Sequence, residues 1–313
     1  MIGVLHFVAI CLPVPATPLW DFVLTESDWV APNIIRVPFT LTGTLITVRA
    51  RVDTVEGNFF FDSGAGRLLL NYRHFANRSG FSSEAGGGVT GKVRVMGSTR
   101  VDTLRMDNLL AGDLSAELID LSHIERAKKT DLVGLIGYEV FKDYEILFDY
   151  EASVLLLVRT DEKGNPFEPV PTWEYRPLGS FGVQVVGHVA VVRLKFGDKG
   201  DKNFALDSGA EQNLLSNGAG SRFLKAHFEI VKRVKLKGAG QTGIEVLSGS
   251  LQHAHLDTFQ FRPMATLLTN LSEINATYET NVDGILGYEF LSQRPVGINY
   301  KKRRLTLYEK IRP

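Results

Sequence analysis

The sequence predicts a mainly β protein built from two tandem copies of one unit. The first observation is a repeat, in which Asn58–Ala65 (NFFFDSGA) recurs 145 residues later as Asn203–Ala210 (NFALDSGA) with six of eight positions identical. The second is Gly134–Glu139 (GLIGYE), which recurs 150 residues later as Gly284–Glu289 (GILGYE). The third is the alternation of polar and apolar residues between short glycine-bearing turns, which is typical of half-buried strands. A repeat of about half the chain length predicts two lobes of similar fold.

Length and composition agree with two globular lobes. The chain has 313 residues, which suits two domains of about 150 residues each. Hydrophobic residues make up 44% and charged residues 22%, which excludes a mainly disordered or collagen-like chain. The 35 basic and 35 acidic residues balance, so no net field attracts nucleic acid, an anionic membrane or a strongly acidic substrate. Nucleic acid is therefore not an expected partner.

The chain opens with an apolar run, Ile2–Val14, followed by proline and small residues. The run is short for a membrane span, and the residues after it resemble a signal-peptidase site. We expect residues 1–18 to be a signal peptide and the protein to be exported to the periplasm, the cell surface or the medium, although no Lys or Arg precedes Arg36. The alternatives are a truncated start or an ordered N-terminal strand. The sole cysteine, Cys11, lies in this run, so an intramolecular disulfide, a zinc–thiolate site and a cysteine nucleophile are not expected.

The expected elements follow in the same order in each copy. Alternating stretches such as Thr47–Val52 and Val191–Lys195 are predicted strands. Tyr138–Tyr144 and Tyr288–Gln293 begin after glycine and lack a β-branched bias, so each is predicted to be one short helix. Proline and glycine concentrate in Gly164–Pro171, which cannot continue a helix or a central strand. The expected organisation is a lobe over residues 19–158, a linker over 159–172 and a second lobe over 173–313.

In each copy an apolar strand runs directly into Asp-Ser-Gly-Ala, at Asp62 and at Asp207. An acidic residue at the end of a buried strand, on a turn that needs glycine, is unfavourable unless it is hydrogen-bonded or used. Two such residues at matching positions of the repeat indicate a functional role for both carboxyl groups. If the copies pack about a pseudo-twofold axis, the two loops meet there and the carboxylates face each other.

This combination resembles the retropepsin-like aspartyl proteases, and most closely the tandem forms among bacterial exported proteins. The family pattern is an apolar strand, Asp-(Thr/Ser)-Gly-Ala, a glycine-rich flap, and an apolar-apolar-Gly motif before a short helix and a final strand pair. Both copies match it, over about Asn33–Val158 and Trp173–Glu309. Asp-Ser-Gly alone is a weak match, but its pairing with Leu135–Gly137 and Ile285–Gly287 makes the pattern specific. The resemblance implies two acid-protease β-barrel lobes, each with a short helix, and an active-site cleft between them.

The resemblance further implies an aspartic endopeptidase in which Asp62 and Asp207 share a proton and activate water against a peptide carbonyl. Aspartic proteases are the standard example of such coupled carboxyls, so the coupling of the pKa values is taken from the family. Ser63 and Ser208 would interlock the loops through hydroxyl hydrogen bonds to the opposite lobe. The residues that would support the carboxylates are Gly64, Ala65, Gly209 and Ala210. Pepsin-like enzymes often carry Ser or Thr at the two alanine positions, and without that hydroxyl the shared proton should stay bound to higher pH.

Two glycine-rich strings, Gly86–Gly91 and Gly238–Gly243, lie where the family has its mobile flap. Both also satisfy the dinucleotide fingerprint G-x-G-x-x-G, but strand-like alternation follows where a helix would be required. Glu211 stands where retroviral members carry a substrate-binding aspartate, whereas the first copy has Gly66 there. The expected substrate-binding residues are Glu211, Gly88 and Gly240.

The remaining patterns are interpreted as structural. His253 and His255 would share one strand face, but no third ligand lies nearby in sequence, so neither a metal nor a cofactor is expected. Lys301–Arg304 is interpreted as a solvated turn between the last two strands, and no G-x-S-x-G elbow supports a serine hydrolase. The expected partner is a peptide or protein substrate, bound by a monomer whose lobes pair within one chain. The alternative is a non-catalytic peptide-binding module on the same fold, which would bind extended chain by β-addition.

Overall fold

A computed structural model describes residues 33–78, 85–88, 91–197, 200–236, 244–277 and 279–311. Strands account for 53% of the structure and helices for 14%, so the mainly β class predicted from the sequence is confirmed. All described residues fall in one contact unit. The expected signal peptide over residues 1–18, Cys11 within it, and the string Gly238–Gly243 with Gly240 lie outside the described residues.

Two eight-stranded sheets, one from each half of the chain, have the same strand order. The first runs β2 (Thr40–Thr42), β3 (Leu45–Val52), β4 (Val55–Phe61), β9 (Gly134–Ile136), β5 (Leu68–Asn71), β8 (Leu109–Ile119), β7 (Gly91–Met106) and β6 (Ala85–Gly88). The second runs β13 (Gln184–Val186), β14 (Val189–Leu194), β15 (Lys202–Leu206), β22 (Gly284–Leu286), β16 (Asn213–Ser216), β21 (Met264–Thr269), β18 (Ile244–Leu251) and β17 (Phe228–Leu236). The sequence repeat is therefore a repeat of topology.

In each sheet the strand that leads into Asp-Ser-Gly-Ala pairs in parallel with the strand of the apolar-apolar-Gly motif. Phe61 at the end of β4 lies opposite Ile136, and Leu206 at the end of β15 lies opposite Leu286. The last three residues of both strands are buried. Strands buried on both faces are continuously apolar, which is why these segments do not alternate.

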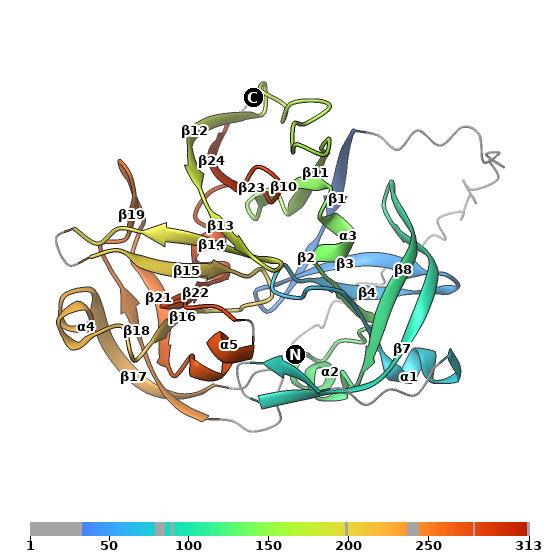
Figure 1. Cartoon of the computed structure of the whole chain (residues 1–313), viewed down its shortest axis with the longest axis horizontal. Coiled ribbons are helices and arrows are strands. Elements are labelled where there is room, and N and C mark those ends of the chain that lie inside the picture. Colours follow the sequence, from blue (N-terminus) through green and yellow to red (C-terminus); the bar gives the residue numbers. More distant parts are fainter. Residues whose placement is uncertain are drawn as a thin grey trace, which may run out of the picture. The chain divides into compact units, whose positions relative to one another are not determined.

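A six-stranded sheet joins the two halves (Figure 1). Its order is β1 (Ile34–Pro38), β11 (Val154–Arg159), β10 (Tyr144–Asp149), β23 (Val296–Asn299), β24 (Arg304–Lys310) and β12 (Tyr175–Gly182). The order is palindromic about the central β10–β23 pair, because each half contributes its first strand at the edge and its final hairpin inside. β10 and β23 run antiparallel, with Glu145 opposite Asn299 and Phe148 opposite Val296. Antiparallel pairing of equivalent strands is what a twofold relation between the halves requires.

Turns and small elements complete the two halves. The chain turns between β23 and β24 at residues 301–303, which confirms the turn predicted there. A two-stranded sheet forms from β19 (His255–Leu256) and β20 (Phe259–Gln260). The glycine-rich strings are followed by strands β7 and β18, so the helix that a dinucleotide site requires is not present at either place.

The helices are short, and more numerous than predicted. α3 (Tyr138–Phe141) and α6 (Tyr288–Leu291) lie where one helix per half was expected, although each ends earlier. The others are α1 (Tyr72–Phe75), α2 (Ser122–Lys128), α4 (Ser221–His227) and α5 (Ser272–Thr277), with a 3-10 turn at Ala76–Arg78. The prediction of a single helix per half was therefore wrong, because one or two turns are too short to establish a 3.6-residue period. In the described part of the chain, no helix has the length and apolar character needed to cross a membrane.

The connection between the halves lies between the end of β11 and the start of β12. Thr160 forms an isolated bridge with Pro166, and Lys301 Nζ donates a hydrogen bond to the Asp161 carbonyl at 3.1 Å. The segment predicted to be a linker is thus attached to the turn between β23 and β24.

Candidate active site

The two repeated aspartates end equivalent strands. Asp62 follows β4 and donates its backbone N–H to Ile136 O at 3.0 Å, and Asp207 follows β15 and donates to Leu286 O at 3.0 Å. The parallel ladder therefore continues one residue beyond each strand before the chain turns. Both aspartates retain some solvent exposure, whereas the residues just before them are buried. The carboxyl groups are thus held in place by the two sheets.

Backbone N–H groups bind both carboxyls. Asp62 Oδ1 accepts hydrogen bonds from Gly64 N at 2.9 Å and Ala65 N at 3.1 Å. Asp207 Oδ1 accepts one from Gly209 N at 2.8 Å. Such donors favour the ionised carboxylate. Asp62 therefore receives two donors from its own loop, whereas Asp207 receives one from its own loop and is also approached by the N–H of Gly64 from the opposite loop.

The glycine after each Asp-Ser pair allows the opposite aspartate to approach. A Cβ atom at Gly64 would lie 2.6 Å from Asp207 Cγ, and one at Gly209 would lie 2.5 Å from Asp62 Cγ. Any side chain at these positions would push the opposite carboxyl away. The two carboxyls are close enough to share a hydrogen bond.

Ser63 and Ser208 interlock the two loops. Ser63 N donates to Ser208 Oγ at 3.0 Å, and Ser208 N donates to Ser63 Oγ at 2.9 Å. Ser208 Oγ also donates to Phe61 O at 2.9 Å. Both serines are 1% exposed, so these polar groups are satisfied by the opposite half of the chain and not by solvent.

Burial raises the pKa of both aspartates, but not equally. For Asp62 burial outweighs the hydrogen bond from Asp207 and the N–H group of Gly64, which act to lower its pKa. For Asp207 burial and then the charge of Asp62 hold the pKa well above its ordinary value. Two interacting carboxyls titrate as one unit. The arrangement favours a pair with one proton, carried by Asp207, and one charge, carried by Asp62.

Two more glycines allow the chain to pass behind the aspartate loops. A Cβ atom at Gly137 would lie 2.1 Å from Arg67 O, and one at Gly287 would lie 2.1 Å from Ala210 O. The next residues, Tyr138 and Tyr288, donate their N–H groups to Ala65 O at 2.8 Å and Ala210 O at 3.1 Å. The two alanines thus tie their loops to the starts of α3 and α6.

Glu211 and Gly66, which are equivalent in the repeat, have different surroundings. The Glu211 carboxylate forms an ion pair with Lys128 of α2, and its backbone O accepts a hydrogen bond from Thr44 Oγ1 at 3.1 Å. Its side chain lies against Gly43, where a Cβ atom would be 2.7 Å from Glu211 Oε1. Gly66 instead lies against the ring of His188, a residue that the sequence motifs did not indicate.

Four tyrosines that sequence reasoning gave no role form crossed pairs between the halves. Tyr138 at the start of α3 contacts Tyr300 after β23, with ring centroids 5.0 Å apart. Tyr288 at the start of α6 contacts Tyr150 after β10 at 5.3 Å. Burial raises the pKa of both Tyr150 and Tyr300, and the charge of Asp207 adds to the increase. The signal was present in the sequence, because both tyrosines of each equivalent pair recur at a spacing of 150 residues.

Other predicted residues lie apart from the dyad or are described only in part. Gly88 ends β6 and pairs with Gly91 in a hairpin. His253 has a left-handed backbone (φ 63°) outside any strand, and His255 begins β19, so they do not share a strand face as the sequence suggested. The turn at His253 interrupts the alternation on which that expectation depended. Among the described residues, no group of three or more His, Cys, Asp or Glu side chains could hold a metal ion.

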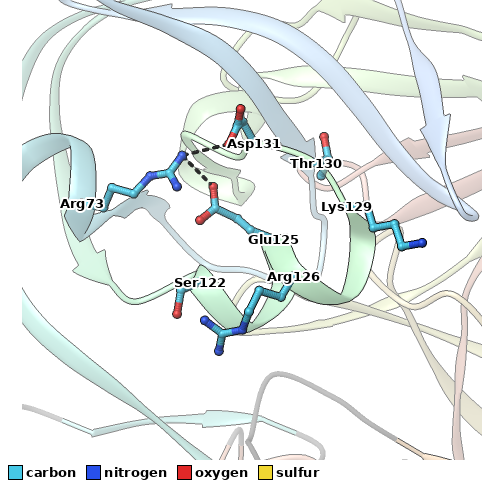
Figure 2. A pocket seen from close by; sticks show the side chains of 7 residues that line it. All are labelled: Arg73, Ser122, Glu125, Arg126, Lys129, Thr130 and Asp131. Carbon is cyan, nitrogen blue, oxygen red and sulfur yellow. Dashed lines mark hydrogen bonds and ion pairs between the residues drawn. The ribbon is translucent and has the colours of Figure 1, made fainter.

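A pocket of about 360 Å³ has no lining residue from the aspartate loops, and Figure 2 shows the residues that line it: Arg73, Ser122, Glu125, Arg126, Lys129, Thr130 and Asp131. In Figure 2 the Arg73 guanidinium is directed at Glu125 and Asp131, each 3.1 Å away. The buried Glu125 also accepts the N–H of Leu132 at 2.9 Å. These contacts tie α1 to α2 and the turn after it, which indicates a structural role.

Comparison with known proteins adds no assignment. No protein-family model matches the chain, and no curated protein sequence matches it.

Proposed function

We propose that this protein is an aspartic endopeptidase, with Asp62 and Asp207 as its catalytic dyad. The observation that carries the proposal is the meeting of two carboxyls from equivalent loops, close enough that a Cβ atom on Gly64 or Gly209 would collide with the opposite aspartate. Two carboxylates close enough to share a hydrogen bond repel each other unless one of them is protonated. A proton shared between two carboxyls is the chemistry that peptide hydrolysis by this class of enzyme uses.

The proposal includes a fold of two retropepsin-like lobes in tandem. The matching order of the two eight-stranded sheets and the palindromic six-stranded sheet support it. So does the exchange of hydrogen bonds between Ser63 and Ser208, which makes each loop depend on the other half. A substrate would lie across both halves, where the dyad is.

The dyad would hydrolyse a peptide by general acid and base catalysis. Asp62, the ionised partner, takes a proton from a water molecule as the water oxygen attacks the peptide carbonyl carbon. Asp207 gives its proton to the carbonyl oxygen, which yields a neutral tetrahedral diol. The proton on Asp62 then passes to the amide nitrogen as the carbon–nitrogen bond breaks, and a diol hydroxyl returns a proton to Asp207. The products are a carboxylic acid and an amine, and the dyad regains its starting state.

Substrate recognition would differ on the two sides of the dyad. Glu211 presents a partly exposed carboxylate beside one loop, whereas Gly66 offers no side chain beside the other. We propose Glu211 as a contact for the substrate main chain, held in place by Lys128. We also propose Gly88 and Gly240 as substrate-binding residues of the flap.

The decisive experiment is cleavage of denatured casein and of a peptide library, with and without pepstatin. Asp62→Asn and Asp207→Asn keep the side-chain shape but cannot share the proton, so each should lower cleavage by about 10²- to 10⁴-fold. Asp131→Asn is the matched control, because its carboxylate is 89% exposed and pairs with Arg73 away from the dyad. Folded wild-type protein that binds peptides without cutting them would select the peptide-binding alternative.

A further inference from the structure

The turn between β13 and β14 brings His188 of the second half against the Asp62 loop of the first half. His188 Nε2 lies 3.0 Å from Gly64 O. A carbonyl oxygen only accepts, so Nε2 carries a hydrogen and donates it. The other ring nitrogen, Nδ1, faces Gly66, where a Cβ atom would be 3.0 Å away.

One peptide group links this histidine to the dyad. The carbonyl that accepts from His188 belongs to the peptide bond between Gly64 and Ala65, and the N–H of that same peptide donates to Asp62 Oδ1 at 3.1 Å. Consecutive hydrogen bonds through one peptide polarise each other, so a donor on the carbonyl strengthens the N–H as a donor. The charge on a protonated imidazole also favours an ionised Asp62 directly, by lowering its pKa.

The second aspartate loop has no such arrangement within the described residues. The hairpin turns align as Thr42–Leu45 and Val186–Val189, so Thr44 is equivalent to His188. Thr44 Oγ1 donates a hydrogen bond to Glu211 O at 3.1 Å, and not to the Gly209 carbonyl that is equivalent to Gly64 O. The N–H groups of Ala65 and Ala210 each donate to the backbone O of their own aspartate, at 3.3 and 3.2 Å, and the N–H of Ala65 also donates to Asp62 Oδ1. Gly66 leaves room for the His188 ring, and Gly43 leaves room for Glu211. Both large side chains therefore come from the second half, and only one of them acts on a dyad carboxyl.

We propose that His188 is a positioning residue that holds the negative charge of the dyad on Asp62 and leaves the shared proton on Asp207. This inference rests on the proposed peptidase activity. Among the described residues, the ionisable groups that face the dyad or the imidazole include Tyr138, Tyr150 and Tyr300. A tyrosine hydroxyl is uncharged in the acidic and neutral range. Unlike these tyrosines, the imidazole of His188 can carry a positive charge.

The test is the pH profile of kcat/KM for peptide cleavage by wild type, His188→Gln and His188→Ala. Glutamine keeps an N–H that can reach Gly64 O but has no charge. In acid, loss of the positive charge makes the ionised dyad less favourable, so the acidic limb of the profile should move to higher pH by about 0.5 to 1 unit in both variants. His188→Ala also loses the hydrogen bond, and kcat should fall roughly tenfold further while KM changes little. His74→Gln is the matched control, since His74 lies in α1 and contacts Arg73 and Phe75.

A measurement without turnover separates this inference from the peptidase proposal. Carboxyl-carbon NMR of ¹³C-labelled aspartates, assigned with the two Asp→Asn variants, should show the dyad ionising at higher pH in His188→Gln than in wild type. Gly66→Ala, which keeps the histidine but presses on its ring, should give a smaller shift in the same direction. An unchanged titration and an unchanged acidic limb in folded His188→Gln would overturn the role of His188. A wild type that cleaves nothing, with the expected NMR shift present, would overturn only the peptidase.

Discussion

The dyad carboxyls make the free energy of unfolding depend on pH. Because the pKa of Asp207 is raised on folding, the unfolded chain ionises first as the pH rises, and ionisation opposes folding. This penalty is absent below the ordinary aspartate pKa of about 3.9 and grows as the pH rises from there toward the folded-state pKa.

Asp207→Asn removes the ionisable group while keeping its shape. We expect its midpoint of thermal unfolding to exceed that of wild type by roughly 2–4 °C at pH 7 and to match it at pH 3. Circular dichroism melts at the two pH values measure the difference, with Asp131→Asn as the exposed control. An equal gain at both pH values would show that packing, and not charge, is responsible.

The same raised pKa values set the pH range of activity. If the proposed dyad works with one proton, the acidic limb of its activity follows the lower apparent pKa of the pair and the alkaline limb follows the higher one, and burial raises the pKa of both members. Ala65 and Ala210 supply no hydroxyl that would lower them. We expect an optimum between mildly acidic and near-neutral pH, measured as kcat/KM against pH. A maximum below about pH 3, where the lower pepsin-type pKa controls activity, contradicts this.

At the scale of the elements, the glycines just before α3 and α6 leave no space for a side chain. Gly287→Ala would place a methyl group 2.1 Å from Ala210 O in the Asp207 loop. We expect unfolding free energy to fall by about 3 kcal/mol and activity to fall with it, since backbone atoms must move. Gly182→Ala in β12 is the matched control, because nothing lies within 4 Å of its Cβ position. Urea unfolding midpoints compare the two, and similar losses in both variants would rule out the steric explanation.

The elements also show how far the sequence could be interpreted. The strands before Asp62 and Asp207 and the turn at 301–303 follow from local patterns, because neighbours in sequence determine them. Helices such as α1 and α4 are too short for a period to be visible. His188 was not identified because its partner, Gly64, is 124 residues away and no motif contains both. Aligning the repeats makes it equivalent to Thr44, which does not indicate a role for a histidine.

At the scale of the molecule, one chain supplies both aspartate loops and both halves of the joining sheet. The β10–β23 pair and the Ser63–Ser208 exchange make the two halves mutually dependent. The connection between β11 and β12 makes their pairing intramolecular, so it does not depend on protein concentration. We expect specific activity to stay constant on dilution and neither half to cleave alone. Activity per chain that falls steeply on dilution, or a first half that cuts peptides as a dimer, would refute a single-chain site.

The palindromic sheet also imposes an order on biosynthesis. β1, β11 and β10 can pair once residue 159 has left the ribosome, but β23 and β24 follow only near the end of translation. At about 5–20 residues per second the outer edge of β10 therefore waits roughly 7–30 s for its partner, and an open strand edge is a template for aggregation. The same delay postpones completion of the candidate active site. If the protein is the proposed peptidase, a nascent chain that still lacks its second carboxyl loop and central strand cannot digest the ribosome-bound chains around it.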